Sequence, residues 1–334
     1  MARKNKETKY LAMDFGTSKT IAYVSGLGVI FNGPSVLAYD NSKKKIIAVG
    51  EEALNMMDKT PPHISILEPL QNGAITDRGL AEAYLKRVFE SVEIKDVWKD
   101  ANVVISSASN ISVLEKQAFE KMFINLGVKT IRIVPSALMA ALGSGMKILE
   151  PKGHLLLELG AGLISCSIIS NNNVLVNKVY KKAGNFFNEE IEKYIRAKYS
   201  LEIGRNTAEQ IKKEFGGFAA KSNRKLKISG RSLLGGGPKN ELIDSNEIKN
   251  IVVGLFRPVL NLLMEVLEQT PPELTGDILD EGITITGGSS AFQGLKEYLS
   301  NNFQITVNKF SNIKTSVIDG LIKYEEIYEN DLLD

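Results

Sequence analysis

The sequence uses one short structural device twice. The stretches YLAMDFGTSKTIAYVSG and LLLELGAGLISCSIIS each contain an apolar strand, an acid near its end, a glycine turn and a second strand. Aligning Asp14 with Glu158 also aligns Gly16 with Gly160, at a spacing of 144 residues. A supersecondary unit that recurs at this distance predicts two related α/β halves that face one site.

The segments between the two copies alternate between strands and helices. Three segments have the pattern of strands: PSVLAYD, KKIIAVG and ANVVISS. Two have the pattern of helices: ITDRGLAEAYLKRVFESV and SVLEKQAFEKMFINLG. This βα rhythm is typical of a mainly parallel sheet. SALMAALGSGM predicts a small-residue helix that packs closely between two domains. Farther on, Pro258 is expected to bend or restart a long apolar-striped helix, and GITITGGSSAFQGL predicts a strand, a glycine pair and a helix N-terminus.

Composition narrows the functional classes. The chain has 334 residues, a formal net charge of +2 and one cysteine, Cys166. The near-neutral balance argues against nucleic-acid binding, and a lone cysteine in an apolar strand fits a reducing, cytoplasmic compartment. His63 and His154 have no Cys or His partners at metal-ligand spacing. No run approaches the roughly 18 apolar residues of a membrane span.

The glycine turns predict phosphate binding, because glycine lets backbone N–H groups approach an anion closely. In DFGTSKT, the residues Gly16, Thr17, Ser18 and Lys19 offer amides, hydroxyls and an ammonium. Asp14 would repel phosphate directly and is expected to hold the waters of a Mg²⁺ ion instead. The alternative is two ordinary hairpins and a helix cap, but three such turns in one chain favour a nucleotide site.

A series of segments spread along the chain resembles the MreB family of bacterial actins. In order, these segments are MDFGTSKT, AVGEEALNMM, TPPHISILEPLQNGAITD, NEEIEKYIRAKYSLEIGRNTAEQIKKEFG and TPPELTGDILDEGITITGGSSAFQGL. The resemblance implies an α/β, actin-like (ribonuclease H-like, duplicated) fold with ATP or ADP and Mg²⁺ in a central cleft. It also implies cytoplasmic filaments of paired protofilaments. The lysine-rich composition leans toward members from wall-less bacteria, which serve shape and swimming. The expected subdomains are IA (1–33, 66–147 and 315–334), IB (34–65), IIA (148–182 and 245–314) and IIB (183–244).

The resemblance also assigns site residues. It places the first phosphate loop at Gly16–Lys19 and the second at Gly160, Ala161 and Gly162. It places the ribose and base segment at Ala208, Glu209 and Lys212, with Glu209 accepting from ribose hydroxyls and Lys212 flanking the adenine. The glycine turn beneath the adenosine corresponds to Gly287, Gly288, Ser289 and Ser290. Asp14 and Glu158 are the expected Mg²⁺ residues, acting through water.

The sequence departs from the family at the hydrolytic positions. Pro135 and Ser136 stand at two positions where the family has acids, and Leu163 and Ile164 stand where it has threonines. A serine cannot act as a carboxylate base, and the loss of a positioned base typically costs 10²–10⁴-fold in rate. We therefore expect no intact catalytic residues and very slow ATP hydrolysis at most. A one-residue slip in the alignment, or compensation by Glu158, is the alternative.

Further expectations concern partners. The stretch VEIKDVWKDANVV predicts an exposed loop in which Val97 and Trp98 contact the inner face of the membrane; a tryptophan folded onto the core is the alternative. Paralogous actin-like proteins are a further candidate partner. Two other functions compete with a filament: a small-molecule phosphotransferase of the same fold, and a non-polymerising regulator of active relatives.

Overall fold

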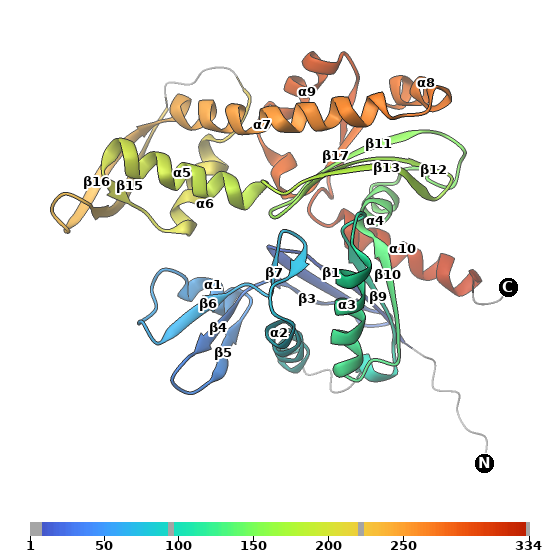
Figure 1. Cartoon of the computed structure of the whole chain (residues 1–334), viewed down its shortest axis with the longest axis horizontal. Coiled ribbons are helices and arrows are strands. Elements are labelled where there is room, and N and C mark those ends of the chain that lie inside the picture. Colours follow the sequence, from blue (N-terminus) through green and yellow to red (C-terminus); the bar gives the residue numbers. More distant parts are fainter. Residues whose placement is uncertain (1–8, 93–96, 220–223, 332–334) are drawn as a thin grey trace. The chain divides into compact units, whose positions relative to one another are not determined.

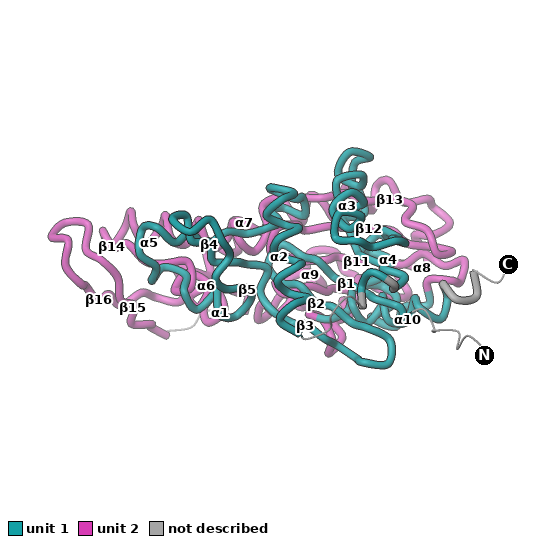
Figure 2. The backbone as a smooth tube through the Cα atoms, turned by 90° about the horizontal axis from the view of Figure 1, so that it is seen from below, with its two compact units in different colours: residues 1–147, 315–334 teal, residues 148–314 magenta. Residues whose placement is uncertain are grey.

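The computed structural model describes residues 9–92, 97–219 and 224–331. These residues form two compact units, which Figure 2 draws in two colours. Unit 1 comprises residues from 1–147 and 315–334, and unit 2 comprises residues from 148–314. The chain therefore leaves unit 1 once and returns to it with its last helix.

Unit 1 is built on a five-stranded sheet with the order β10-β9-β1-β2-β3 (Figure 1). Strand β1 is antiparallel to β2 and parallel to β9, and β9 is parallel to β10. The strands are β1 (Tyr10–Phe15), β2 (Lys19–Val24), β3 (Gly28–Pro34), β9 (Asn102–Ser107) and β10 (Thr130–Pro135). The apolar run at the start of β1 is buried, as a central strand between two covered faces requires.

Helices surround this sheet, and two small sheets extend unit 1. The helices are α1 (Glu51–Met56), α2 (Arg78–Ser91), the 3₁₀ helix η1 (Val97–Asp100), α3 (Val113–Asn125), α4 (Ser136–Gly143) and α10 (Ser316–Asp331). The small sheets contain β4 (Leu37–Asp40), β5 (Lys45–Val49) and β6 (Ile64–Leu67), and β7 (Leu70–Gln71) with β8 (Ala74–Ile75). The two helices predicted before and after ANVVISS are confirmed as α2 and α3, and Ser112 caps α3 with a full capping box.

The small-residue helix, α4, packs closely against α10 of the same unit, whereas its predicted packing between two domains stays a prediction. A Cβ on Gly143 would lie 1.7 Å from the Ser316 carbonyl oxygen, and one on Gly320 would lie 1.8 Å from that of Met139. Only glycine permits this approach, so both helices carry one at the crossing.

Unit 2 repeats the topology of unit 1 with the order β13-β12-β11-β17-β18. Its hairpin β11–β12 is antiparallel, and β17 pairs in parallel with both β11 and β18. The strands are β11 (His154–Leu159), β12 (Ile164–Ser170), β13 (Asn173–Tyr180), β17 (Ile283–Thr286) and β18 (Val307–Lys309). Each five-stranded sheet thus joins three antiparallel strands to two parallel ones, which confirms the predicted duplication and the α/β class.

The rest of unit 2 is mostly helical. Its helices are α5 (Gly184–Tyr199), α6 (Arg205–Phe215), α7 (Ser245–Glu268), α8 (Pro272–Glu281), the 3₁₀ helix η2 (Gly288–Ala291) and α9 (Leu295–Phe303). A small sheet contains β14 (Leu201–Glu202), β15 (Lys225–Ser232) and β16 (Pro238–Asp244). Strands β15 and β16 pair as an antiparallel hairpin.

Helix α7 runs through Pro258 as one element, so the predicted restart is wrong. Among the described residues it is the one helix whose length and apolar composition would allow it to cross a membrane. Its buried stripe contacts β12 and β13 and belongs to the cores of unit 2. The stripe consists of Ile248, Val252, Phe256, Val259, Leu262, Leu263 and Val266.

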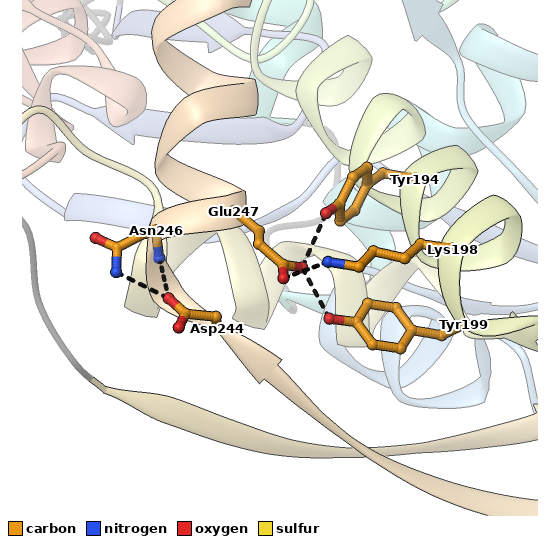
Figure 3. Close-up of polar contacts among 6 residues, drawn as sticks. All are labelled: Tyr194, Lys198, Tyr199, Asp244, Asn246 and Glu247. Carbon is orange, nitrogen blue, oxygen red and sulfur yellow. Dashed lines mark hydrogen bonds and ion pairs between the residues drawn. The ribbon is translucent and has the colours of Figure 1, made fainter.

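A carboxylate joins the C-terminal end of α5 to the start of α7 (Figure 3). Glu247 accepts hydrogen bonds of 2.8 Å from the hydroxyls of both Tyr194 and Tyr199, and it pairs with the Lys198 ammonium. Burial alone would raise the pKa of Glu247, but these three donors hold it below its usual value. The position of α5 within unit 2 is therefore fixed at this end.

The structure corrects the expectation for Trp98. This side chain is 7% exposed, stacks on Phe89 with ring centroids 4.7 Å apart, and donates its Nε1–H to the Leu126 carbonyl at 3.0 Å. The indole gains apolar burial and satisfies its polar atom within unit 1, so it does not face a membrane. The side chain of Val97 and residues 93–96 of the predicted loop lie outside the described residues.

Candidate nucleotide-binding site

The first glycine turn connects β1 to β2 in unit 1. The Gly16 amide donates to the Lys19 carbonyl at 2.9 Å. A Cβ on Gly16 would lie 3.0 Å from that same oxygen, so the tight turn favours glycine. Thr17 is buried and its hydroxyl accepts from the Gly73 amide at 3.1 Å, whereas Ser18 is exposed.

Buried hydroxyls support this turn from behind. Ser35 donates its hydroxyl to the Gly16 carbonyl at 2.7 Å, and its amide donates to the Ser18 carbonyl at 3.1 Å. Thr20 lies 2.8 Å from the Ser35 hydroxyl and accepts from the Tyr84 hydroxyl at 3.1 Å. The carbonyls of Gly16 and Ser18 are thus held by the protein, and the Gly16 amide is bonded within the turn, so a ligand would meet the amides that follow Gly16.

Asp14 is the penultimate residue of β1, two residues before Gly16. Burial raises its pKa to about 6, although a 3.0 Å hydrogen bond from the Ser106 hydroxyl and the charge of Lys19 pull the pKa down. The carboxylate is ionised at neutral pH and sits in a setting where a cation would stabilise its charge. A carboxyl with a strongly shifted pKa beside a glycine turn is a candidate functional residue.

The second glycine turn connects β11 to β12 in unit 2 and repeats the geometry of the first. The Gly160 amide donates to the Leu163 carbonyl at 2.9 Å, and a Cβ on Gly160 would lie 2.7 Å from that oxygen. Glu158 takes the place of Asp14, and its carboxylate accepts from the Ser165 hydroxyl at 3.0 Å. The predicted equivalence of the two turns holds in hydrogen bonding as well as in sequence.

Two other segments of unit 2 close around this second turn. The amides of Gly184 and Asn185 donate to the carbonyls of Gly160 and Ala161 at 3.2 Å and 2.8 Å. Gly287 has a positive φ of 86°, and its Cβ would lie 2.5 Å from the Leu159 carbonyl oxygen. Glycines therefore let three backbone segments meet at one place.

The pair Gly287–Gly288 enters a 3₁₀ turn, not the α-helix that the sequence predicted. Helix α9 begins only at Leu295, after the left-handed Gly294. The Ser289 hydroxyl lies 3.4 Å from the Gly160 carbonyl, and the Ser290 hydroxyl is buried and donates to the Gly287 carbonyl at 2.7 Å. The turn thus offers backbone groups without an α-helix dipole behind them.

Helices α5 and α6 bring Asn188, Glu209 and Lys212 together. The Glu209 carboxylate oxygen Oε2 lies 2.6 Å from the Lys212 ammonium and 2.7 Å from the Asn188 amide nitrogen. Lys212 also donates to the Gly184 carbonyl at 2.9 Å, and burial lowers its pKa. Burial would raise the pKa of Glu209, but Lys212 and Asn188 outweigh it and keep that pKa low.

Ala208 lies in the core next to this group. It is fully buried among Ile191, Ile195 and Ile211, so its side chain packs α6 against α5. Its position brings Glu209 to the surface, where that side chain is 33% exposed.

The hydrolytic positions lie on well-formed elements. Pro135 ends β10 and Ser136 is the first residue of α4 in unit 1. In unit 2, Leu163 is half-buried at the turn, whereas Ile164 is buried in the core. A side chain at 164 points into that core, so the missing hydroxyl matters chiefly at Leu163.

Asp14 in unit 1 and Glu158 in unit 2 are the two carboxylates expected to face a hydrated magnesium ion. No cluster of three or more His, Cys, Asp or Glu side chains occurs within 9–92, 97–219 and 224–331. Mg²⁺ commonly keeps several waters and uses one or two carboxylates together with phosphate oxygens. Each of the two acids lies beside a glycine turn, which matches this mode of binding and not an all-protein cage.

Sequence reasoning missed several residues that hold the site. Ser106 and Ser35 bind Asp14 and Gly16, and Asn188 binds Glu209. Ser106 is 92 residues from Asp14 in the sequence, and no local spacing indicates the contact. The serines at strand ends would have been the available signal, since Ser165 stands seven residues after Glu158 on the hairpin partner strand.

Two copies of a five-stranded sheet, each with an acid and a glycine turn at one strand end, define an actin-like protein. The family model described as MreB/Mbl protein matches residues 8–332. The chain belongs to the MreB/Mbl family.

Individual relatives agree with this assignment. The chain is 33% identical to the cell shape-determining protein Mbl of Bacillus subtilis over 89% of its length and 90% of the relative. It is 30% identical to the cell shape-determining protein MreB of Escherichia coli, over 93% of its own length and 91% of the relative. The MreB 5 structure of Spiroplasma citri bound to AMPPNP has a TM-score of 0.94 and 36% identity, with 98% of each chain covered. A MamK double helical filament, at 21% identity and a TM-score of 0.79, shares the fold.

Proposed function

We propose that this protein is a filament-forming bacterial actin that binds ATP with Mg²⁺ and hydrolyses it very slowly. The nucleotide acts as a structural clamp: binding favours the conformation that polymerises. The filament consists of paired protofilaments in the cytoplasm and serves cell shape or motility. The name of the curated relatives, cell shape-determining protein, supports the first of these roles.

The observation that carries nucleotide binding is the matched geometry of the two glycine turns. In both turns a glycine amide bonds to the carbonyl three residues later at 2.9 Å, next to a strand-end acid. Phosphate binding needs only backbone amides and a cation. Because the Gly16 and Gly160 amides close the turns themselves, the amides that follow them are the ones proposed to bind phosphate. The Spiroplasma citri relative at 36% identity is bound to AMPPNP in one structure and to ADP in another, which supports the same ligand class here.

The proposed roles of the residues follow from their chemistry. The amides that follow Gly16 and Gly160 in the two loops, Gly16–Lys19 and Gly160–Gly162, bind phosphate oxygens, and the Lys19 ammonium neutralises their charge. Asp14 and Glu158 would hold a hydrated Mg²⁺ ion through its waters, and the ion would supply positive charge to the phosphates. Glu209 accepts from the ribose, Lys212 flanks the base, and the Gly287–Ser290 turn lies beneath the adenosine.

Slow hydrolysis follows from the hydrolytic positions. Phosphoryl transfer to water depends on positioning the attacking water and stabilising charge. Ser136 supplies no carboxylate for the first task, and Leu163 supplies no hydroxyl. The groups that bind phosphate are retained, so binding and hydrolysis are separated in this chain. Disassembly therefore needs a trigger other than phosphate release.

Electron microscopy of the purified protein tests the proposal. Samples contain Mg²⁺ with ATP, with ADP or without nucleotide, and Gly160→Ala serves as a variant with a damaged second turn. Paired protofilaments that depend on ATP, and that Gly160→Ala fails to form, support the proposal. Monomers in every condition would favour a phosphotransferase or a regulator that joins filaments of active relatives.

A further inference from the structure

The side chain of Asn188 is buried in a manner that needs an explanation. Only 2% of the residue is exposed, and its Nδ2 donates to Glu209 Oε2 at 2.7 Å. Its Oδ1 is also buried and has no hydrogen-bond partner among the described residues. A buried acceptor without a partner costs about 1–3 kcal/mol. An apolar side chain of similar size would avoid this cost, so the donating half of the amide must serve a purpose.

The orientation of the amide is fixed by its partner. The Glu209 carboxylate can only accept, and its low pKa keeps it ionised, so the atom facing it must be the Asn188 nitrogen. The unpartnered atom is therefore the oxygen. Helix α5 holds this arrangement at both ends, through Gly184 at the second glycine turn and through the Glu247 carboxylate at α7.

The two oxygens of Glu209 have different surroundings. Oε2 receives the two buried donors, Asn188 and Lys212, at 2.7 Å and 2.6 Å. Oε1 lies 3.2 Å from the ammonium of Lys213, a side chain that is 69% exposed. The buried donors thus hold one oxygen inward, and the other pairs with an exposed cation that a ligand can displace.

We propose that Asn188 is a positioning residue for ribose recognition, which holds Glu209 so that Oε1 accepts a hydroxyl of the nucleotide sugar. This inference rests on the proposed nucleotide site and adds a residue to it. Lys212 alone fixes the carboxylate at one point, and the second donor, on a different helix, fixes its rotation. The unpartnered Oδ1 is the structural cost of placing an uncharged donor there.

The test compares ATP with 2′-deoxy-ATP and 3′-deoxy-ATP in equilibrium binding to the full chain with Mg²⁺. The wild type is expected to bind ATP at least about tenfold more tightly than one of the two analogues, the effect of one hydrogen bond to a charged group. In Asn188→Leu, ATP binding weakens by about tenfold while binding of that analogue is unchanged, so the preference disappears.

Asn177 provides the matched control. It also buries an unpartnered Oδ1, but its Nδ2 donates to the Ser167 hydroxyl at 2.8 Å on the β12–β13 pair. Asn177→Leu should change thermal stability about as much as Asn188→Leu and leave the sugar preference unchanged. Asn188→Asp is the second variant: it keeps the shape, lacks the donor and repels Glu209, so it too should lose the preference even if Asn188→Leu does not fold.

The outcomes separate this inference from the proposed function. A wild-type protein that binds ATP and prefers the ribose, with the preference intact in the Asn188 variants, overturns the role of Asn188. ATP binding without any sugar preference also overturns it, but leaves nucleotide binding standing. A wild-type protein that does not bind ATP overturns both. Loss of the preference in the Asn188 variants alone supports the inference.

Discussion

The Asp14 carboxylate accepts a 3.0 Å hydrogen bond from the Ser106 hydroxyl on the neighbouring parallel strand. This bond and the charge of Lys19 limit the effect of burial, which raises the pKa of Asp14 from 3.8 to about 6. The acid is thus poised close to physiological pH beside the first glycine turn. Its charge, and with it the proposed attraction for Mg²⁺, is sensitive to mild acidification.

We predict that the Mg²⁺-dependent affinity for ATP falls as the pH is lowered through about 6, because protonated Asp14 cannot orient the waters of a cation. Ser106→Ala removes a hydrogen bond that favours the ionised form, so the fall should move to higher pH. Titration calorimetry between pH 5 and 8, with and without Mg²⁺, measures this. Asp14→Asn controls for titration of the nucleotide itself; a wild-type profile that matches that of Asp14→Asn contradicts the prediction.

The same pKa shift predicts an opposite effect on the stability of the nucleotide-free protein. A raised pKa means that the folded state binds the proton more tightly than the unfolded state. The contribution of Asp14 is therefore fully present below pH 3.8 and is lost as the pH rises through about 6. The unfolding free energy of the wild type, minus that of Asp14→Asn, should therefore decrease as the pH rises from 3.8 through about 6. Denaturant titrations at several pH values measure this difference.

Restoring hydrolytic groups should raise phosphate release. Ser136→Glu combined with Leu163→Thr returns a carboxylate and a hydroxyl to the family positions, and we expect an increase of at least about tenfold, since a positioned base contributes 10²–10⁴-fold. The control is Ser42→Glu, which makes the same charge change in the exposed β4–β5 turn of unit 1. A double variant no faster than the wild type would show that these positions do not limit the reaction.

The second glycine turn should not tolerate a methyl group. In Gly160→Ala the new Cβ would lie 2.7 Å from the Leu163 carbonyl oxygen, so the hydrogen bond that closes the turn must lengthen. We expect loss of most ATP affinity and a stability cost of about 1–3 kcal/mol. Gly276→Ala in α8, where a Cβ meets nothing within 4 Å, is the matched control and should bind ATP normally.

The crossing of α4 and α10 should also not tolerate an added methyl group. Gly320→Ala places a Cβ 1.8 Å from the Met139 carbonyl oxygen, which forces the helices apart at a cost of about 3 kcal/mol or more. Gly254→Ala, at an exposed helical site with free space, should instead stabilise by about 0.5–1 kcal/mol. Thermal unfolding of both variants measures the contrast, and an unchanged melting temperature for Gly320→Ala would show that the two helices do not pack this closely.

The sequence predicts the elements that depend on local patterns. The strand, acid and glycine order around Asp14 and Gly160 indicates the duplicated hairpins, because apolar runs and glycine turns follow from neighbouring residues. The helix over SVLEKQAFEKMFINLG, observed as α3, is predicted for the same reason.

Contacts between distant segments were not predictable in this way. The sequence predicts Trp98 at a membrane because its segment reads as an exposed loop, yet the side chain is buried against Phe89 and bonded to the Leu126 carbonyl. In the sequence alone, Asn188 and Ser106 are ordinary polar residues. The fold brings Asn188 to Glu209 and Ser106 to Asp14, where each donates a hydrogen bond. The pair Gly287–Gly288 was expected to open an α-helix, but its approach to Leu159 leads into a 3₁₀ turn instead.

The central claim is that ATP supports polymer without being consumed, and it is tested most directly by measuring polymer and phosphate in one sample. Wild-type protein with ATP and Mg²⁺ is followed by light scattering and phosphate release, beside the Ser136→Glu and Leu163→Thr double variant. The account predicts that wild-type polymer forms and persists while far less than one phosphate per protomer is released. Phosphate release in step with polymer formation, or no ATP-dependent polymer at all, would contradict it.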